Sequence, residues 1–174
     1  MIKKLSLVLV ASALLSGCLN TTVTNDDFIS YTLVDGINPN ALHSDMNVTV
    51  KVKAPLNKGN IVVKTSDVGL RVTNSHKWAQ SLDEQLKLLT VNELYNHALP
   101  PHLEYDLQIL QFYGSVDGKV YIALSCKVKQ GELIRLDKAY ESVEMQKSDG
   151  YEALVAALKE GYIKLVKRIA LDLI

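Results

Sequence analysis

The segment that closes the chain, residues 151 to 173, constrains the fold more than any other part of the sequence. Its apolar side chains recur at the three- and four-residue spacing of a single helix face. They are Tyr151, Leu154, Val155, Leu158, Tyr162, Leu165, Val166 and Ile169. Asp149 and Glu152 follow Ser148 in the order of a capping box, which predicts the start of this helix. A helix with so broad an apolar face must pack on a second layer.

Alternating apolar and polar residues predict that this second layer is a sheet. The clearest case is "MNVTVKVKA" at residues 46–54, where every second side chain is apolar. Similar runs at 28–34, 60–65 and 69–73 predict further strands in the first half. Two long runs follow at 102–114 and 119–130, joined by the Asp-Gly turn of a tight hairpin, and another follows at 131–146.

A second helix is expected between these two groups of strands. Trp78, Leu82, Leu86, Leu89 and Leu94 follow one another at helical steps, and two prolines at residues 100 and 101 end the pattern. We therefore expect a single α+β domain. A mostly antiparallel sheet would carry two main helices on one face, the second being the long C-terminal helix.

Six residues are predicted to form the structural core between the helices and the sheet: Trp78, Leu82, Leu154, Leu158, Tyr162 and Leu165. Trp78 is the only tryptophan of the chain. A large aromatic residue at a helix start favours core packing. The alternative is that Trp78 lines an apolar groove for lipid.

The N-terminus has the pattern of a bacterial lipoprotein signal. Lys3 and Lys4 precede an apolar run that is too short to span a bilayer as a helix. The run ends in "LSGC", which resembles the lipobox, so Cys18 is predicted to carry diacylglycerol on its thiol and an acyl chain such as palmitate on its amino group. Residues 1–17 would then be a signal peptide. A plain membrane anchor with an incidental cysteine is the alternative.

The segments that follow Cys18 complete the predicted organisation. Residues 18–27 form a polar lipidated tether, and residues 28–174 form the domain. Leu19 and Asn20 follow the cysteine, where Asp would favour inner-membrane retention by resemblance to Gram-negative lipoproteins. We therefore expect a location on the outer membrane, facing the periplasm.

Charge and motif content argue against several function classes. The formal net charge is zero, and removal of residues 1–17 leaves two more acidic than basic residues, so nucleic acid is not an expected partner. The four histidines lack the spacing and the neighbouring ligands of a metal site. Cys126 is predicted to be a small, buried, hydrophobic residue of a strand. No cofactor and no catalytic residue is predicted. A hydrolase that uses His76 or His102 is the weakest alternative, because no nucleophile-presenting turn accompanies either histidine.

The order of these parts resembles the ABC-type transport auxiliary lipoprotein family. The resemblance covers about residues 29–172. It rests on Pro55, the "IVVK" run at 61–64, Leu70, "KWAQSL" at 77–82, "SDGY" at 148–151 and the Ile-Ala pair at 169–170. Lys64 and Lys77 stand where arginine is usual in this family, and Gln80 replaces an acidic residue. Contacts that need a bidentate arginine are therefore not expected here.

The resemblance implies a non-catalytic accessory of a trans-envelope lipid transport system that contributes to membrane integrity. Its implied partners are the membrane, through the lipid anchor, and a periplasmic mammalian-cell-entry-type transport protein. Self-association into a homo-oligomer is also implied. A structural envelope lipoprotein that scaffolds a secretion or peptidoglycan-associated assembly is the alternative, because the same anchor and domain would serve it.

Overall fold

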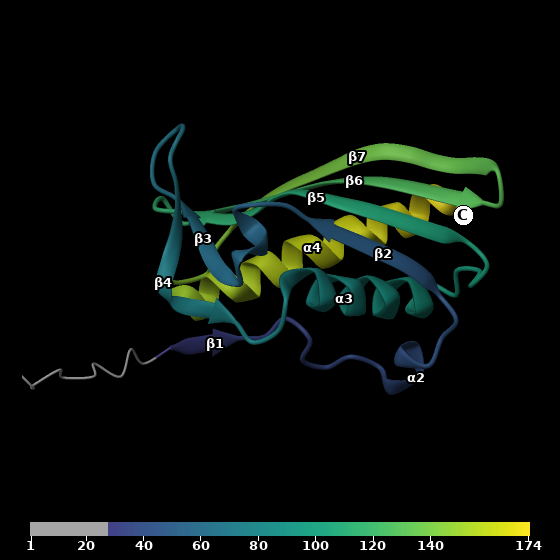
Figure 1. Cartoon of the computed structure of the whole chain (residues 1–174), viewed down its shortest axis with the longest axis horizontal. Coiled ribbons are helices and arrows are strands. Elements are labelled where there is room, and N and C mark those ends of the chain that lie inside the picture. The colour runs from purple at the N-terminus through teal and green to yellow at the C-terminus, as the bar shows by residue number, and fades with distance from the viewer. Residues whose placement is uncertain (1–27) are drawn as a thin grey trace, which may run out of the picture.

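The computed structural model describes residues 28–174 as one sheet with two long helices on the same face (Figure 1). The predicted signal peptide, lipobox and tether lie outside the described residues. The elements are β1 (Ile29–Tyr31), α2 (Pro39–Leu42), β2 (Asn47–Val52), the 3₁₀ turn η1 (Leu56–Lys58), β3 (Asn60–Lys64), β4 (Leu70–Trp78), α3 (Leu82–Asn96), β5 (Glu104–Ser115), β6 (Lys119–Gln130), β7 (Leu133–Met145) and α4 (Tyr151–Leu173).

The sheet is organised around β5. Its strand order is β1-β4-β3-β5-β6-β7, and β2 also pairs with β5. β5, β6 and β7 form a long antiparallel meander, and β3 pairs antiparallel with β4. The α+β fold with a mostly antiparallel sheet is therefore confirmed. Three pairings are parallel and were not expected: β1 with β4, β2 with β5, and β3 with β5.

One edge of β5 pairs with two different strands along its length. β2 pairs with residues 104–109 of β5, and β3 pairs with Gly114 and Ser115 farther along. The antiparallel register with β6 shifts between Ile109 and Gln111, in the stretch between the two partners. A bulge adds local bend and twist, which suits a strand whose neighbour changes along its length.

The core lies between the sheet and the two long helices. Alternate residues of β5 and β6 face the helices and are buried, as their patterning predicted. On α4, Leu158, Tyr162, Leu165 and Val166 have no exposed surface, and the helix runs to Leu173 as expected. Figure 1 shows α3 and α4 beside each other under the strands.

Two glycines let α4 approach the sheet closely. A Cβ atom on Gly161 of α4 would lie 2.5 Å from Ile122 Cδ1 and 3.0 Å from Glu144 Cγ. A Cβ atom on Gly114 of β5 would collide with Leu154 Cδ1. Glycine at these positions removes the side chain that would hold the two layers apart.

The predicted start of the first long helix is wrong. Trp78 is the last residue of β4, and its backbone nitrogen donates to the Gly59 carbonyl oxygen at 2.9 Å. α3 begins only at Leu82, after Ser81. The helical spacing from Trp78 to Leu82 is accidental, because both side chains enter the same core from different elements.

Two other local predictions also need correction. α4 begins after Gly150, whose φ of 106° suits glycine, and no side chain caps the helix, so the expected capping box is absent. The expected strand over residues 28–34 is only three residues long. The chain then turns inward, and the Leu33 backbone nitrogen donates to Gln85 Oε1 at 2.7 Å.

The close approach of α4 makes a stability prediction. We expect Gly161→Val to destabilise the domain by about 1–3 kcal/mol, because the added carbons overpack against Ile122 and Glu144. Ala156→Val, at an exposed position of the same helix, is the matched control for β-branching. Thermal unfolding measures both variants, and equal losses would contradict the close-contact explanation.

Candidate functional surfaces

The six predicted core residues lie in the interior. Trp78 is 7% exposed, Leu82 3% and Leu154 6%, whereas Leu158, Tyr162 and Leu165 are fully buried. These side chains fill the space between the helices and the sheet, and they do not form a reactive cluster.

Trp78 packs on the core side of the sheet. Its ring lies 6.0 Å from that of Phe112, which in turn meets Tyr162 edge-on at 6.2 Å. The Tyr162 hydroxyl lies 2.7 Å from that of Thr90, so its polar end is hydrogen-bonded inside the core. Trp78 therefore contributes to an aromatic core, and its burial argues against a surface groove for lipid.

The basic residues of α4 are engaged with the rest of the domain. Lys159 Nζ donates to the Asp35 carbonyl oxygen at 2.7 Å, and Arg168 donates to the Glu141 carbonyl oxygen at 3.2 Å. Lys167 Nζ lies 3.9 Å from Glu93 Oε2. This face is thus used for internal contacts, which lowers its availability for an acidic partner.

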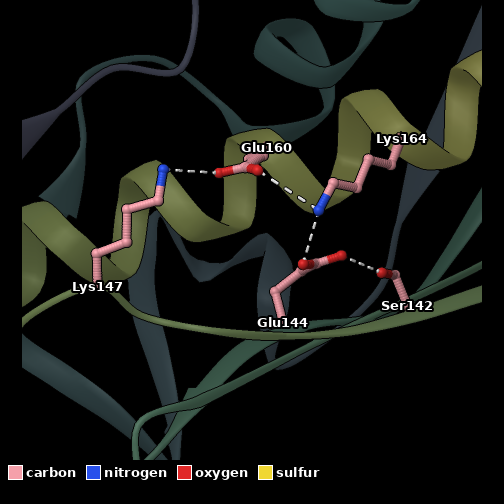
Figure 2. Close-up of polar contacts among 5 residues, drawn as sticks. All are labelled: Ser142, Glu144, Lys147, Glu160 and Lys164. Atoms are coloured by element: carbon pink, nitrogen blue, oxygen red, sulfur yellow. Dashed lines mark hydrogen bonds and ion pairs between the residues drawn. The ribbon is translucent and has the colours of Figure 1, made fainter.

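Lys164 joins the longest of these ionic networks, which Figure 2 shows between α4 and the end of β7. Its Nζ lies 2.8 Å from Glu144 Oε2 and 3.4 Å from Glu160 Oε1. Glu160 also pairs with Lys147 at 3.4 Å, and Ser142 donates to Glu144 at 2.7 Å. The hydrogen bonds from Lys164 and Ser142 hold the pKa of Glu144 below its ordinary value.

A second polar cluster joins the far end of α4 to β7. Asp172 accepts hydrogen bonds from the Tyr140 hydroxyl at 2.6 Å and from Lys138 Nζ at 2.8 Å. Burial, followed by the hydrogen bond to Asp172, raises the pKa of Tyr140. Arg168 lies over the Tyr140 ring, with 5.6 Å from Cζ to the ring centroid. The edge strand β7 is therefore held to α4 along most of its length.

Cys126 lies on the core side of β6 and is 1% exposed, which confirms its interpretation as a small buried hydrophobe. Burial, followed by the charges of Asp106 and Asp137, raises the pKa of its thiol to about 12. The nucleophilic thiolate is therefore disfavoured at neutral pH.

The histidines have structural surroundings. His76 Nδ1 lies 3.1 Å from the Tyr31 hydroxyl, and its ring stacks on Tyr151 at 3.6 Å. His102 contacts the Gln130 side chain at the surface. His43 and His97 each approach a backbone carbonyl oxygen four residues earlier, at 2.9 Å. Within residues 28–174, no group of three or more His, Cys, Asp and Glu side chains is placed to hold a metal ion.

The outer face of the sheet, opposite the helices, has two different halves. Near the start of β5, ion pairs join Lys51 to Asp106 at 2.8 Å and Lys127 to Asp137 at 2.9 Å. A shallow polar hollow of about 230 Å³ lies over this half. The other half carries Tyr113 and Tyr121, whose ring centroids are 5.7 Å apart.

One group of exposed apolar side chains lies at the end of the molecule opposite β1, which we call the distal end. Figure 1 places the β6–β7 turn and the C-terminus of α4 at this end of the long axis. Leu133 and Ile134 of β7 are 58% and 52% exposed, and Leu171 and Ile174 at the end of the chain are 65% and 83% exposed. Hydropathy alone did not reveal this surface, because it joins residues from two elements that are far apart in sequence.

A family model described as "ABC-type transport auxiliary lipoprotein component" matches residues 47–170, from the start of β2 almost to the end of α4. The chain belongs to this family. The resemblance inferred from its motifs is therefore confirmed. In this transport auxiliary lipoprotein, no helix of the described part is long and apolar enough to cross a membrane.

Curated relatives agree with this assignment, and solved structures share the fold. Intermembrane transport lipoprotein PqiC of Escherichia coli (strain K12) and that of Shigella flexneri are each 28% identical over 167 residues, which cover 87% of this chain and 88% of the relative. The crystal structure of an uncharacterized protein shares the fold with a TM-score of 0.69 at 23% identity, over 75% of this chain and 94% of that one. Protein XCC0632 from Xanthomonas campestris does so with a TM-score of 0.62 at 14% identity, over 73% and 82%.

The network of Figure 2 predicts a pH-dependent contribution to stability. Because the pKa of Glu144 is lowered from 4.5, its contribution is present above pH 4.5 and is lost as the pH falls below that value. We expect Glu144→Gln to lower the Tm at pH 7 by about 2–4 °C, which corresponds to about 1 kcal/mol in a domain of this size. At pH 3 the difference from the wild type should be much smaller.

Glu132→Gln is the matched control, since it removes the same charge from an exposed position in the β6–β7 turn. Calorimetry at the two pH values compares the three proteins. A Glu144→Gln deficit that is as large at pH 3 as at pH 7 would mean that ionic contacts of Glu144 are not its cause.

Proposed function

We propose that this protein is a non-catalytic lipoprotein accessory of a trans-envelope lipid transport system. The observation that carries the proposal is the family match over residues 47–170. The naming of the curated relatives as intermembrane transport lipoproteins supports the same role. The accessory would supply position and a docking surface, and the chemistry and energy would come from its partners.

The proposed anchor is Cys18, carrying diacylglycerol and an N-acyl chain, in the outer membrane and facing the periplasm. Two or more acyl chains hold a protein stably on a bilayer, whereas one chain binds marginally. The "LSGC" motif and the absence of Asp after Cys18 support this assignment. Such an anchor would fix the protein at the outer membrane, where the transported lipid is received. In this position the protein would help to maintain membrane integrity.

The proposed partner is a mammalian-cell-entry-type transport protein in the periplasm, and the proposed docking surface is the distal end. The described chain begins at β1, at the end of the long axis opposite the C-terminus (Figure 1). A domain tethered through β1 would turn its distal end away from the membrane. The exposed leucine and isoleucine side chains there provide the apolar centre that protein interfaces require. A homo-oligomer would present several such surfaces together.

Anchoring is tested by Cys18→Ala. We expect this variant to leave the outer-membrane fraction and to lose function in a strain that lacks the wild-type protein, because no acyl chain is attached. Membrane fractionation and the intact mass of the mature protein measure the change. A variant that stays in the outer membrane would contradict a lipid anchor at this residue.

Docking at the distal end is tested by a double substitution, Leu133→Asp with Leu171→Asp. We expect in vivo cross-linking to the transport partner to fall by about tenfold, because buried apolar anchors carry most interface energy. Leu110→Asp is the matched control, since Leu110 is 50% exposed on β5 away from this end.

The same cross-linking experiment distinguishes the accessory from a scaffold. Recovery of a mammalian-cell-entry-type protein by the wild type and by Leu110→Asp would support the accessory role. Recovery of peptidoglycan-associated or secretion proteins alone would contradict it.

A further inference from the structure

β4 contains an enlarged bulge where it passes β3. Val72 pairs with Val62 and Lys77 pairs with Asn60, so Ile61 alone stands opposite the four residues Thr73–His76. The Thr73 hydroxyl lies 2.9 Å from the Ile61 carbonyl oxygen and 2.7 Å from that of His76, which fixes the bulge internally. Bulges of this kind redirect side chains and are common next to functional sites.

The bulge forms one wall of a hollow of about 190 Å³, and Tyr151 in the first turn of α4 completes it. Residues 71–76 make up the rest of the lining. The His76 ring is fixed here by its stacking on Tyr151 and by its contact with the Tyr31 hydroxyl. The hollow is therefore supported by side chains from β1, β4 and α4.

The polar groups that line this hollow are free of contacts within the domain. Arg71, Asn74 and Ser75 are exposed, their side chains and the Tyr151 hydroxyl have no hydrogen bond or ion pair to another residue of 28–174, and no carboxylate lines the hollow. An arginine guanidinium that shares a lining with amide and hydroxyl groups is suited to a phosphate group, which accepts several hydrogen bonds at once.

The hollow lies where the chain enters the domain. Ile29 of β1 pairs with His76, and Lys77 Nζ lies 3.4 Å from the ring centroid of Phe28, the first described residue. The ten residues from Cys18 to Asp27 can reach at most about 35 Å when extended. A domain anchored through Cys18 thus keeps this hollow within reach of the bilayer surface.

We propose that this hollow binds the phosphate group of a phospholipid headgroup in the membrane that carries the anchor. The inference rests on the anchoring at Cys18 put forward under the proposed function. Binding would orient the domain, holding its β1 end against the headgroups and its distal end toward the periplasm. Arg71 would supply the positive charge, and Ser75, Asn74 and Tyr151 would supply neutral donors.

Glu152 provides a second, opposite test of the site. Glu152 directly follows Tyr151 in the first turn of α4, so its carboxylate is close to the hollow although it does not line it. A negative charge at this distance weakens the binding of an anion. Its removal should therefore strengthen headgroup binding.

The test uses the full lipidated protein in two kinds of vesicle, one of phosphatidylethanolamine with phosphatidylglycerol and one of the phosphate-free lipid digalactosyldiacylglycerol. Hydrogen exchange of the amides of residues 71–76 is compared between them. In the phospholipid vesicles we expect exchange to be slower on the order of tenfold, as for a charge-assisted contact. Arg71→Gln should lose this protection, and Glu152→Gln should increase it.

Arg135→Gln is the matched control, because it removes the same charge from an exposed position on β7 at the distal end. It should keep the protection seen in the wild type. The fluorescence of Trp78, which is buried beside Phe112, checks that each variant is folded.

Equal exchange in the two vesicles, or protection that persists in Arg71→Gln, would overturn the proposal. Inorganic phosphate added to the galactolipid vesicles should give little protection. If it protects as well as phospholipid does, the site binds a free anion and the membrane assignment is wrong. Acylation of Cys18 is checked in the same preparation by the mass of the N-terminal peptide. An acylated protein without protection refutes only the headgroup site, whereas an unmodified Cys18 refutes the anchor itself.

Discussion

The contact between α4 and the sheet is the constraint on which the rest of the structure depends. Gly114 and Gly161 bring the helix and the sheet so close that Ile122 and Leu154 fill the space where a Cβ would otherwise lie. At this separation the aromatic residues of α4 and β5 can interlock, with Tyr162 meeting Phe112 edge-on. Bulky residues at either glycine would force the layers apart and loosen every contact between them.

The charged side chains around α4 extend this packing to the edge of the sheet. β7 is an edge strand, and edge strands are prone to unwanted pairing. In its second half, Tyr140 and Glu144 tie the strand to Asp172 and Lys164 of the helix. The basic residues of α4 therefore act mainly within the domain, and the surfaces left for partner proteins include the distal end and the outer face of the sheet.

The patterns that predicted the fold correctly were long and regular. The alternation over residues 102–130 and the apolar face of residues 151–173 gave the strands and the helix, because each pattern is repeated many times. Trp78 fits a helical and a strand period equally well, so its spacing alone predicts the wrong element. The bulge at Thr73–His76 and the parallel pairing of β1 arise from contacts between distant segments, and no local pattern encodes them. The hollow beside Arg71 could not be predicted for the same reason.

The short β1 also has a mechanical consequence. The tether proposed at the N-terminus would transmit a pull from the membrane first to this strand, which pairs with β4 over the three residues from Ile29 to Tyr31. Beyond it, Leu33 is fully buried and its backbone is bonded to Gln85. Under load, β1 would peel away and release about 10 Å of slack before the force reached the core. The strand would thus yield to a pull before the buried core of the domain does.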